Sequence, residues 1–316
     1  MIRFLINRLP SFVLLLVVTS VIAFALPRMV PGDPAAALAG SDATAEQIEA
    51  IRQQLDLGRP FVVQYFDWLG GLVQGDLGTS ILSGRPVAEL IGDRVESSLE
   101  LTLVAATLMI VIGGVLGVLA GTKQKNWIAG LLDGIIGLLV ATPPHVTGLV
   151  MILIMTLVLP YWPISGEASL ISDPGYGFQL ILLPALALSL PQAAAVARLI
   201  QSNMRTVAQM DFVELARAKG VPPRRIITHH ILRNSLGNAL IVIALRVGEL
   251  LSGAVVIEAI FARNGLGQLA VAATQSRDYM VVQVIIVGAV AIAALVNMLS
   301  EIGLAILDPR IRLDTK

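Results

Sequence analysis

The sequence predicts an all-α integral membrane protein that crosses the bilayer about six times. Two observations carry this prediction. The composition is 56% hydrophobic and only 14% charged, with a mean hydropathy of +0.81, whereas about a quarter of the residues in a soluble domain are charged. The apolar residues also gather in runs of about 20, the length that an α-helix needs to cross roughly 30 Å of hydrocarbon.

Six apolar segments are long enough to cross the bilayer, and we expect each of them to span it. They are residues 9–27, the run between Glu100 and Lys123, residues 141–160, the run between Asp173 and Arg198, residues 234–261, and the run between Asp278 and Glu301. The first has no small-residue cleavage site before a polar mature start, so it is predicted to be an anchor and not a signal peptide. Because Pro143 and Pro144 break a helix interior, we expect a bent third span preceded by an approach segment.

The distribution of Lys and Arg predicts which side of the membrane each loop faces, because cytoplasmic loops are enriched in these residues. With the N-terminus inside, 14 of the 22 basic residues are cytoplasmic, 7 are outside, and Arg246 lies within a span. Six spans then place both termini in the cytoplasm. The predicted parts are an N-terminal anchor at 1–29, an extracytoplasmic segment at 30–97 with a helix near 45–55, a core transmembrane domain at 98–310 with a cytoplasmic loop at 199–233, and a cytoplasmic tail at 311–316.

The composition and the motifs argue against several classes of chemistry in this chain. The formal net charge is zero and there is no cysteine, so neither a global basic field for nucleic acid nor a thiolate metal site is expected. No Gly-Lys dipeptide occurs, which excludes a Walker A loop. His229 and His230 are adjacent and would point about 100 degrees apart on a helix, so hydrogen bonding is favoured over metal binding. We predict no catalytic, cofactor-binding or metal-binding residue.

A short helix is predicted inside the large cytoplasmic loop, between Asp211 and Gly220. Asp211 is a good N-cap residue, and Glu214 three positions later completes the pattern of a capping box. Gly220 suits the left-handed position after a helix, and Pro222 with Pro223 prevents the helix from continuing. The pattern therefore predicts a helix of about two turns.

A helix of this length needs a packing partner, because isolated helices shorter than about 12 residues are marginal in water. Phe212, Leu215 and Ala216 share one face, and Glu214 and Arg217 lie on another. Two partners are compatible with this pattern. The helix could pack on the membrane spans of its own chain, or it could present its apolar face to a separate protein.

The loop resembles the signature loop of the permeases of ABC importers. In that family the loop holds Glu-Ala-Ala, a Gly four residues after the last Ala, and a later Leu-Pro. This chain has Glu214, Leu215 in place of the first Ala, Ala216 and Gly220, followed by Leu232 and an Arg where Pro is usual. That departure, at Arg233, is similar to the peptide-transport branch of the family.

Further motifs extend the resemblance over nearly the whole chain. They are Pro31-Gly-Asp-Pro34, Leu55-Asp-Leu-Gly58, Gly75-Asp-Leu-Gly78, Arg85-Pro-Val-Ala-Glu-Leu-Ile91, Asn264-Gly-Leu-Gly-Gln268, Arg277-Asp-Tyr279 and Leu307-Asp-Pro-Arg310. Each is weak alone, but their order and spacing are similar to those of dipeptide and oligopeptide permeases.

This resemblance implies a type I ABC importer permease fold in the cell inner membrane and a function in peptide transport by alternating access. The implied partners are a second homologous permease subunit, two ATPase subunits that bind ATP and Mg, and an extracytoplasmic peptide-binding protein. The loop that would couple the permease to the ATPases comprises Asp211, Phe212, Glu214, Leu215, Ala216, Arg217, Lys219 and Gly220. The substrate stays open, because similar permeases carry dipeptides, oligopeptides, nickel chelates, glutathione or haem.

Two charged residues inside the fifth span mark either the translocation path or a subunit interface. Arg246 and Glu249 are three residues apart, so they share one helix face, where ionisable groups usually meet a bundle interior or a wet cavity. Both interpretations are kept. Glu258, near the end of the same span, is expected to meet water or neighbouring backbone and is assigned no role.

Two rival classes are less favoured. A secondary transporter is expected to show inverted repeats with paired broken helices, and none is visible in the sequence. A non-transporting membrane scaffold would need neither the short inner helix nor the polar groups of the fifth span.

Overall fold

The computed structural model describes residues 2–29, 35–36, 43–54, 58–122 and 127–307, and these ranges are predominantly helical. Apart from the helices, the described residues contain one isolated β-bridge, between Thr79 and Pro86. The chain divides into two compact units. Met1–Glu96 and Gly265–Leu295 form the first, and Ser97–Asn264 and Val296–Lys316 form the second. The long helices α5 (Val87–Thr122) and α13 (Tyr279–Leu307) contribute to both.

The first unit contains α1 (Ile2–Met29), α3 (Ala45–Gln54), α4 (Phe61–Val73) and α12 (Leu266–Gln275). Helix α1 packs on α4 through aromatic rings, with the centroid of Phe24 5.2 Å from that of Phe61 and 5.5 Å from that of Tyr65. The hydroxyl groups of Ser20 and Tyr65 share a buried hydrogen bond of 2.8 Å. These contacts join α1 to α4. Helix α3 confirms the helix predicted near residues 45–55.

A second part of the first unit joins the turn before α5 to the segment before α13. The Ser80 hydroxyl donates a buried hydrogen bond of 2.5 Å to Asp278. Gly78 has a φ of +75°, and a Cβ at this position would lie 3.1 Å from the Met280 side chain. Glycine is therefore required here both by the left-handed backbone and by the close approach of Met280.

The second unit is built around α8 (Pro174–Val207), with α6 (Trp127–Ala141), α7 (Pro144–Val158) and α11 (Arg233–Ile260) packed on it. The rest of α5 also lies against α8. A Cβ at Gly113 would come within 2.7 Å of the Ala193 carbonyl oxygen, and one at Gly117 within 2.8 Å of the Ile200 Cβ. These two glycines let α5 and α8 approach closely, as small residues commonly do between membrane helices.

The break predicted at Pro143 and Pro144 is confirmed. Helices α6 and α7 meet at 110° across Thr142 and Pro143. Both helices are apolar, so the bent pair forms one broken span or a re-entrant loop. The predicted span at residues 141–160 therefore coincides with α7, and the approach segment before it is the regular helix α6.

Several helices have the length and composition of membrane spans. Among the described residues, apolar stretches of α1, α5, α8 and α13 qualify, and the bent pair α6 and α7 makes a fifth if it forms one broken span. The multi-span, all-helical fold class is confirmed. A sixth span through α11, and the side of the membrane on which each terminus lies, stay predictions.

Two helices extend well beyond the predicted spans. Helix α5 begins at Val87, far ahead of Glu100, and α8 continues past Arg198 to Val207. The added turns carry charged residues on exposed faces, such as Glu89 and Asp93, which pair with Arg85. A search for charge-free runs stops at such residues, although charged residues such as Glu are compatible with a helix outside the bilayer.

Candidate functional site: a short helix at the end of the bundle

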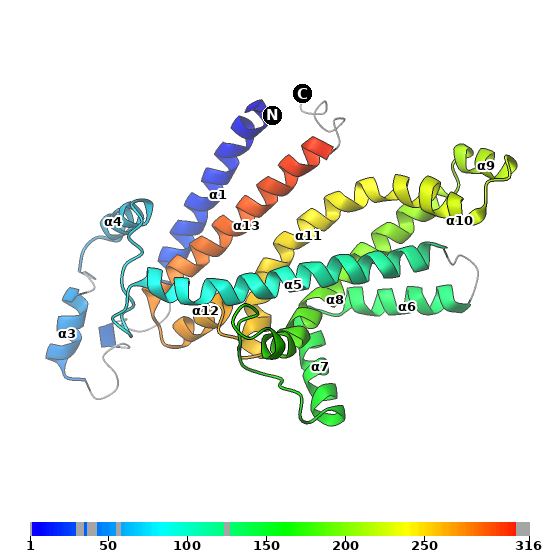
Figure 1. The fold of residues 1–316 in the computed structure, drawn as a ribbon. Helices are drawn as coiled ribbons and strands as arrows, with labels where there is room; N and C mark the ends of the chain where they lie inside the picture. The colour runs from blue at the N-terminus through cyan, green and yellow to red at the C-terminus, as the bar shows by residue number, and fades with distance from the viewer. Residues whose placement is uncertain (1, 30–34, 37–42, 55–57, 123–126, 308–316) are drawn as a thin grey trace. The chain divides into compact units, whose positions relative to one another are not determined.

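The predicted loop helix is confirmed as α9 (Asp211–Ala218), which lies beyond the ends of α8 and α11 (Figure 1). It is eight residues long. The chain then passes through the short α10 (Pro223–Arg225) and a π-helical segment, η1 (Ile226–Leu232), directly into α11. Helix α9 packs against η1. The π-helical segment was not predicted, because its residues do not differ in type from those of an α-helix.

The end of α9 has the geometry predicted for Gly220. Lys219 is the C-cap residue and Gly220 has a φ of +73°. The Gly220 amide donates to the Arg217 carbonyl at 3.0 Å, and the Val221 amide donates to the Ala216 carbonyl at 3.1 Å. This pair of bonds is the Schellman motif, which satisfies carbonyl groups that have no partner within the helix. The cap fixes where α9 ends and turns the chain toward α10.

The predicted capping box at the start of α9 is wrong. Met210, with an extended backbone, is the N-cap residue, and no side chain caps the helix. Its carbonyl accepts the amides of Val213 at 2.9 Å and Glu214 at 3.4 Å. The turn that ends α8 fixes Met210 in this conformation, so Asp211 is already the first helical residue. Asp211 and Glu214 instead place negative charge in the first turn, where it is favoured by the helix dipole.

The predicted apolar face of α9 divides into a buried part and an exposed part. Ala216 is buried, as is Val213, and both belong to the core that also includes Ile226 and Ile231 of η1. Phe212 and Leu215 remain 39% and 55% exposed. One side of α9 therefore packs on its own chain. Another side exposes apolar side chains that are available to a separate protein. We call exposed Phe212, Leu215 and neighbouring Met210 the α9 patch.

Charged side chains surround the α9 patch. Asp211, Glu214, Arg217 and Lys219 are all exposed. Within the ranges that the structure describes, none of these four makes an ion pair. An apolar centre bordered by charges of both signs is the usual composition of a surface that binds another protein.

The two charged residues of the fifth predicted span form an ion pair on α11. The Arg246 guanidinium lies 2.6 Å from the Glu249 carboxylate and also donates to the Gln192 side chain of α8 at 3.3 Å. The Arg246 side chain is 33% exposed and that of Glu249 51%. Gln192 was not predicted, because nothing in the local sequence shows that α8 brings it to Arg246.

The opposite end of α11 holds a buried polar group that we call the Arg263 cluster, made of Ser98, Glu100, Glu258 and Arg263. Arg263 is fully buried and lies 3.0 Å from the Glu100 carboxylate. Glu258 is 1% exposed and accepts a hydrogen bond of 2.6 Å from Ser98, so the prediction that it meets water or neighbouring backbone is wrong. Burial beside α5 explains the difference.

The Arg263 cluster also holds the loop between α7 and α8. The second carboxylate oxygen of Glu100 accepts the amide of Leu170 at 2.9 Å. One carboxylate thus ties α5 to both that loop and the segment that follows α11. Arg263 was predicted only as a loop charge, because a sequence pattern does not show which loop charges are buried.

The fold and the site together define an α-helical membrane protein whose short helix α9 exposes an apolar patch. The chain belongs to the family of binding-protein-dependent transport system inner membrane components, whose model matches residues 113–313. Residues 1–102 match the model for the N-terminal part of these components. The protein is therefore the permease subunit of an ABC transporter of the inner membrane.

Curated relatives cover the full length of the chain. A probable peptide ABC transporter permease protein, y4tP of Sinorhizobium fredii, is 30% identical over 98% of this chain and 99% of its own length. A putative peptide transport system permease protein of Brucella abortus is 33% identical over 98% and 99%. The glutathione transport system permease protein GsiC of Escherichia coli is 33% identical over 99% of both chains.

Solved structures share the fold. The MetNI methionine ABC transporter in an inward-facing conformation contains a chain with a TM-score of 0.57 and 16% identity, covering 69% of this chain and 96% of its own. An amino acid ABC transporter crystallised with histidines gives a TM-score of 0.51 at 18% identity, covering 71% and 94%. These similarities confirm the predicted type I importer permease fold.

Proposed function

We propose that this permease moves dipeptides or oligopeptides across the cytoplasmic membrane by alternating access, driven by separate ATPase subunits that dock on α9. The observation that carries the proposal is the exposed α9 patch on a helix whose other face is fixed to its own chain. Phe212 and Leu215 offer apolar area to a partner, and Val213 and Ala216 hold the helix in place. A helix built in this way transmits the displacement of its partner.

The connection from α9 to the membrane helices is direct. Helix α9 rests on η1, and η1 continues without interruption into α11. We infer that closure of the ATPases moves α9 and η1 as one body and tilts α11. ATP and Mg would be bound by those subunits, because the permease sequence contains no Gly-Lys dipeptide for a phosphate-binding loop.

We further propose that Arg246 and Glu249 line the path or the contact with a second homologous permease. The pair is partly exposed in the middle of α11, where it offers one charge of each sign. A peptide with free termini carries the complementary charges. Gln192 holds the guanidinium from α8, so the pair joins the two helices that such a path would run along.

The predicted topology supports ATPase docking on the cytoplasmic side and substrate delivery on the outer side. The excess of Lys and Arg supports a cytoplasmic position for both termini and for the loop 199–233, where the ATPases would act. The segment 30–97 would then face outward. We propose that an extracytoplasmic peptide-binding protein delivers its cargo on that side.

Uptake by a strain that lacks this chain tests the function and the substrate together. Labelled dipeptides and oligopeptides are supplied in parallel with nickel and glutathione, because one relative is a glutathione permease. The expected result is a loss of ATP-dependent peptide uptake that the wild-type gene restores. Undiminished peptide uptake would refute the substrate, and loss of glutathione uptake alone would assign the chain to that cargo.

A further inference from the structure

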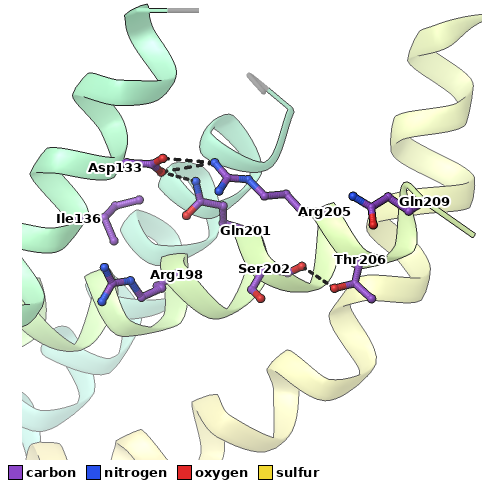
Figure 2. Close-up of a pocket in the computed structure, with 8 residues that line it drawn as sticks. All are labelled: Asp133, Ile136, Arg198, Gln201, Ser202, Arg205, Thr206 and Gln209. Atoms are coloured by element: carbon purple, nitrogen blue, oxygen red, sulfur yellow. Dashed lines mark hydrogen bonds and ion pairs between the residues drawn. The ribbon is translucent and has the colours of Figure 1, made fainter. Parts of the chain in front are cut away.

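A polar pocket of about 400 Å³ lies between α6 and the last three turns of α8 (Figure 2). Its lining residues are Asp133, Ile136, Arg198, Gln201, Ser202, Arg205, Thr206 and Gln209. None of them belongs to the α9 patch or to the Arg246 pair. Gln209 is the residue before Met210, so the pocket ends directly beside the start of α9.

The charges of the pocket leave one arginine available to an anion. The Asp133 carboxylate accepts a hydrogen bond from Gln201 at 2.5 Å and pairs with Arg205 at 3.3 Å. Figure 2 shows these three side chains together and Arg198 apart from them. Among the described residues, Arg198 makes no ion pair. With Asp133 balanced by Arg205, the pocket keeps the positive charge of Arg198, and Ser202, four residues further along α8, adds a hydroxyl group to the lining.

The position of the pocket along the helices places it at the membrane surface. Trp127, at the start of α6, is 79% exposed and lies six residues before Asp133, which is about 9 Å along a helix. Tryptophan favours the interface between lipid and water. Lys123 and Lys125 precede it in the sequence. This is the end of the bundle assigned to the cytoplasmic side, where anionic headgroups attract basic residues.

The surface next to the pocket suits an acyl chain better than it suits a soluble anion. Gly130, Gly134 and Gly137 form one flank of α6, and a Cβ at any of them would meet nothing within 4 Å. Leu131, further round the helix from Gly130, is 53% exposed. A lipid can therefore place its phosphate at Arg198 and its chain along the open glycine flank, whereas free phosphate gains nothing from that flank.

We propose that this pocket binds the headgroup of an anionic phospholipid of the cytoplasmic leaflet, with Arg198 and Ser202 as its principal contacts on the phosphate. The bound lipid holds the last turns of α8 and therefore the position from which α9 starts. This consequence for coupling rests on the function proposed above. The binding itself does not depend on that function.

Native mass spectrometry of the delipidated transporter complex tests the site. The complex is titrated with phosphatidylglycerol and with phosphatidylcholine of the same acyl chains. Phosphatidylglycerol is expected to bind more tightly, and Arg198→Gln should weaken it about fivefold, the effect of one cation near a membrane surface. Ser202→Ala should weaken it less. Arg224→Gln, which removes an exposed arginine of α10, is the matched control and should leave binding unchanged.

Three results would overturn the proposal. The first is equal binding of the two lipids, or equal binding of phosphatidylglycerol by the wild type and Arg198→Gln. Either outcome would show that Arg198 does not bind the headgroup. Displacement of the lipid by inorganic phosphate at matching concentrations would show a site for the free anion. Loss of the ATPase subunits from Arg198→Gln, with lipid binding retained, would show that Arg198 contacts a protein. Thermal unfolding of each variant in phosphatidylcholine confirms that it is folded.

Discussion

The α9 end of α11 exposes charged side chains and two large apolar ones, Phe212 and Leu215, whereas the Arg263 end buries ionisable side chains that bond within the chain. The 28 residues of α11 separate these ends by about 42 Å. At one end, Phe212 and Leu215 are exposed although both are apolar. At the other, Arg263 and Glu258 are buried although both are ionisable.

The difference indicates which end depends on contacts within this chain. A buried charge is tolerated only when it is paired and hydrogen-bonded, and Arg263 has Glu100 for this purpose. Exposed apolar patches often mark binding surfaces, and we interpret the α9 patch in this way. Substitutions at the Arg263 cluster should therefore act on stability, and substitutions at the α9 patch should act on assembly. Four predictions test this contrast, from the largest expected effect to the smallest.

The largest effect is expected from Arg263→Met. The substitution leaves Glu100 buried without its cation, which costs about 3–5 kcal/mol of unfolding free energy. Chemical unfolding of the purified protein in detergent measures this loss. Arg224→Met, at an exposed arginine, should change stability by less than about 0.5 kcal/mol. Equal effects of the two substitutions would contradict the structural role of Arg263.

The next effect is expected from Gly220→Pro, which should abolish ATP-dependent uptake and leave membrane insertion intact. Proline fixes φ near −65°, whereas Gly220 has +73°, and proline also removes the amide that bonds to Arg217. Gly220→Asn is the matched control, because asparagine tolerates the left-handed conformation. Normal coupling in Gly220→Pro, measured as ATPase activity stimulated by transport, would refute the role of the cap.

Leu215→Asp should impair binding of the ATPase subunits without changing the stability of the permease. The side chain is 55% exposed, so the permease should keep its unfolding free energy to within about 0.5 kcal/mol. Copurification of the ATPase subunits should nevertheless be lost, because a charge replaces an apolar contact at the proposed interface. Glu214→Arg is expected to weaken coupling in the same way. Ala218→Asp, at an exposed residue on an adjoining face of α9, is the control. An equal loss of ATPase copurification in this variant would show that the α9 patch is not the specific contact.

Arg246→Gln should lower the unfolding free energy by at most about 1 kcal/mol, because both partners of the pair are partly exposed. Its effect should appear in peptide uptake. A double-mutant cycle with Glu249→Gln measures the coupling of the two residues in transport. Uptake at the wild-type rate in both single variants would exclude the pair from the path.

The sequence was sufficient for the features that depend on local chemistry. Length and hydropathy predicted the helices that have the character of spans, and Pro143 predicted the break between α6 and α7. Gly220 predicted the end of α9, because the Schellman motif has a left-handed residue after the helix and this residue is usually glycine. The resemblance to known permeases suggested that α9 couples the permease to its ATPases, a role that the local sequence alone does not indicate.

The features that depend on packing could not be predicted. Met210 caps α9 because the end of α8 fixes its backbone, and Asp211 gave a misleading signal for that position. Arg263 and Glu258 are buried because α5 lies beside them, which no pattern within their own segments shows. Pro184 and Pro191 lie inside α8, although proline alone would predict breaks there. Neighbouring helices decide each of these outcomes.

Protection of a single cysteine at the α9 patch tests the central claim most directly. The chain contains no cysteine, so Leu215→Cys provides the only thiol of the permease for a maleimide. The account predicts rapid labelling of the permease alone and strong protection in the complex with its ATPases. Tyr161→Cys, at a side chain 99% exposed in the loop after α7, should label equally in both states. Equal labelling of Leu215→Cys with and without the ATPases would contradict docking on α9.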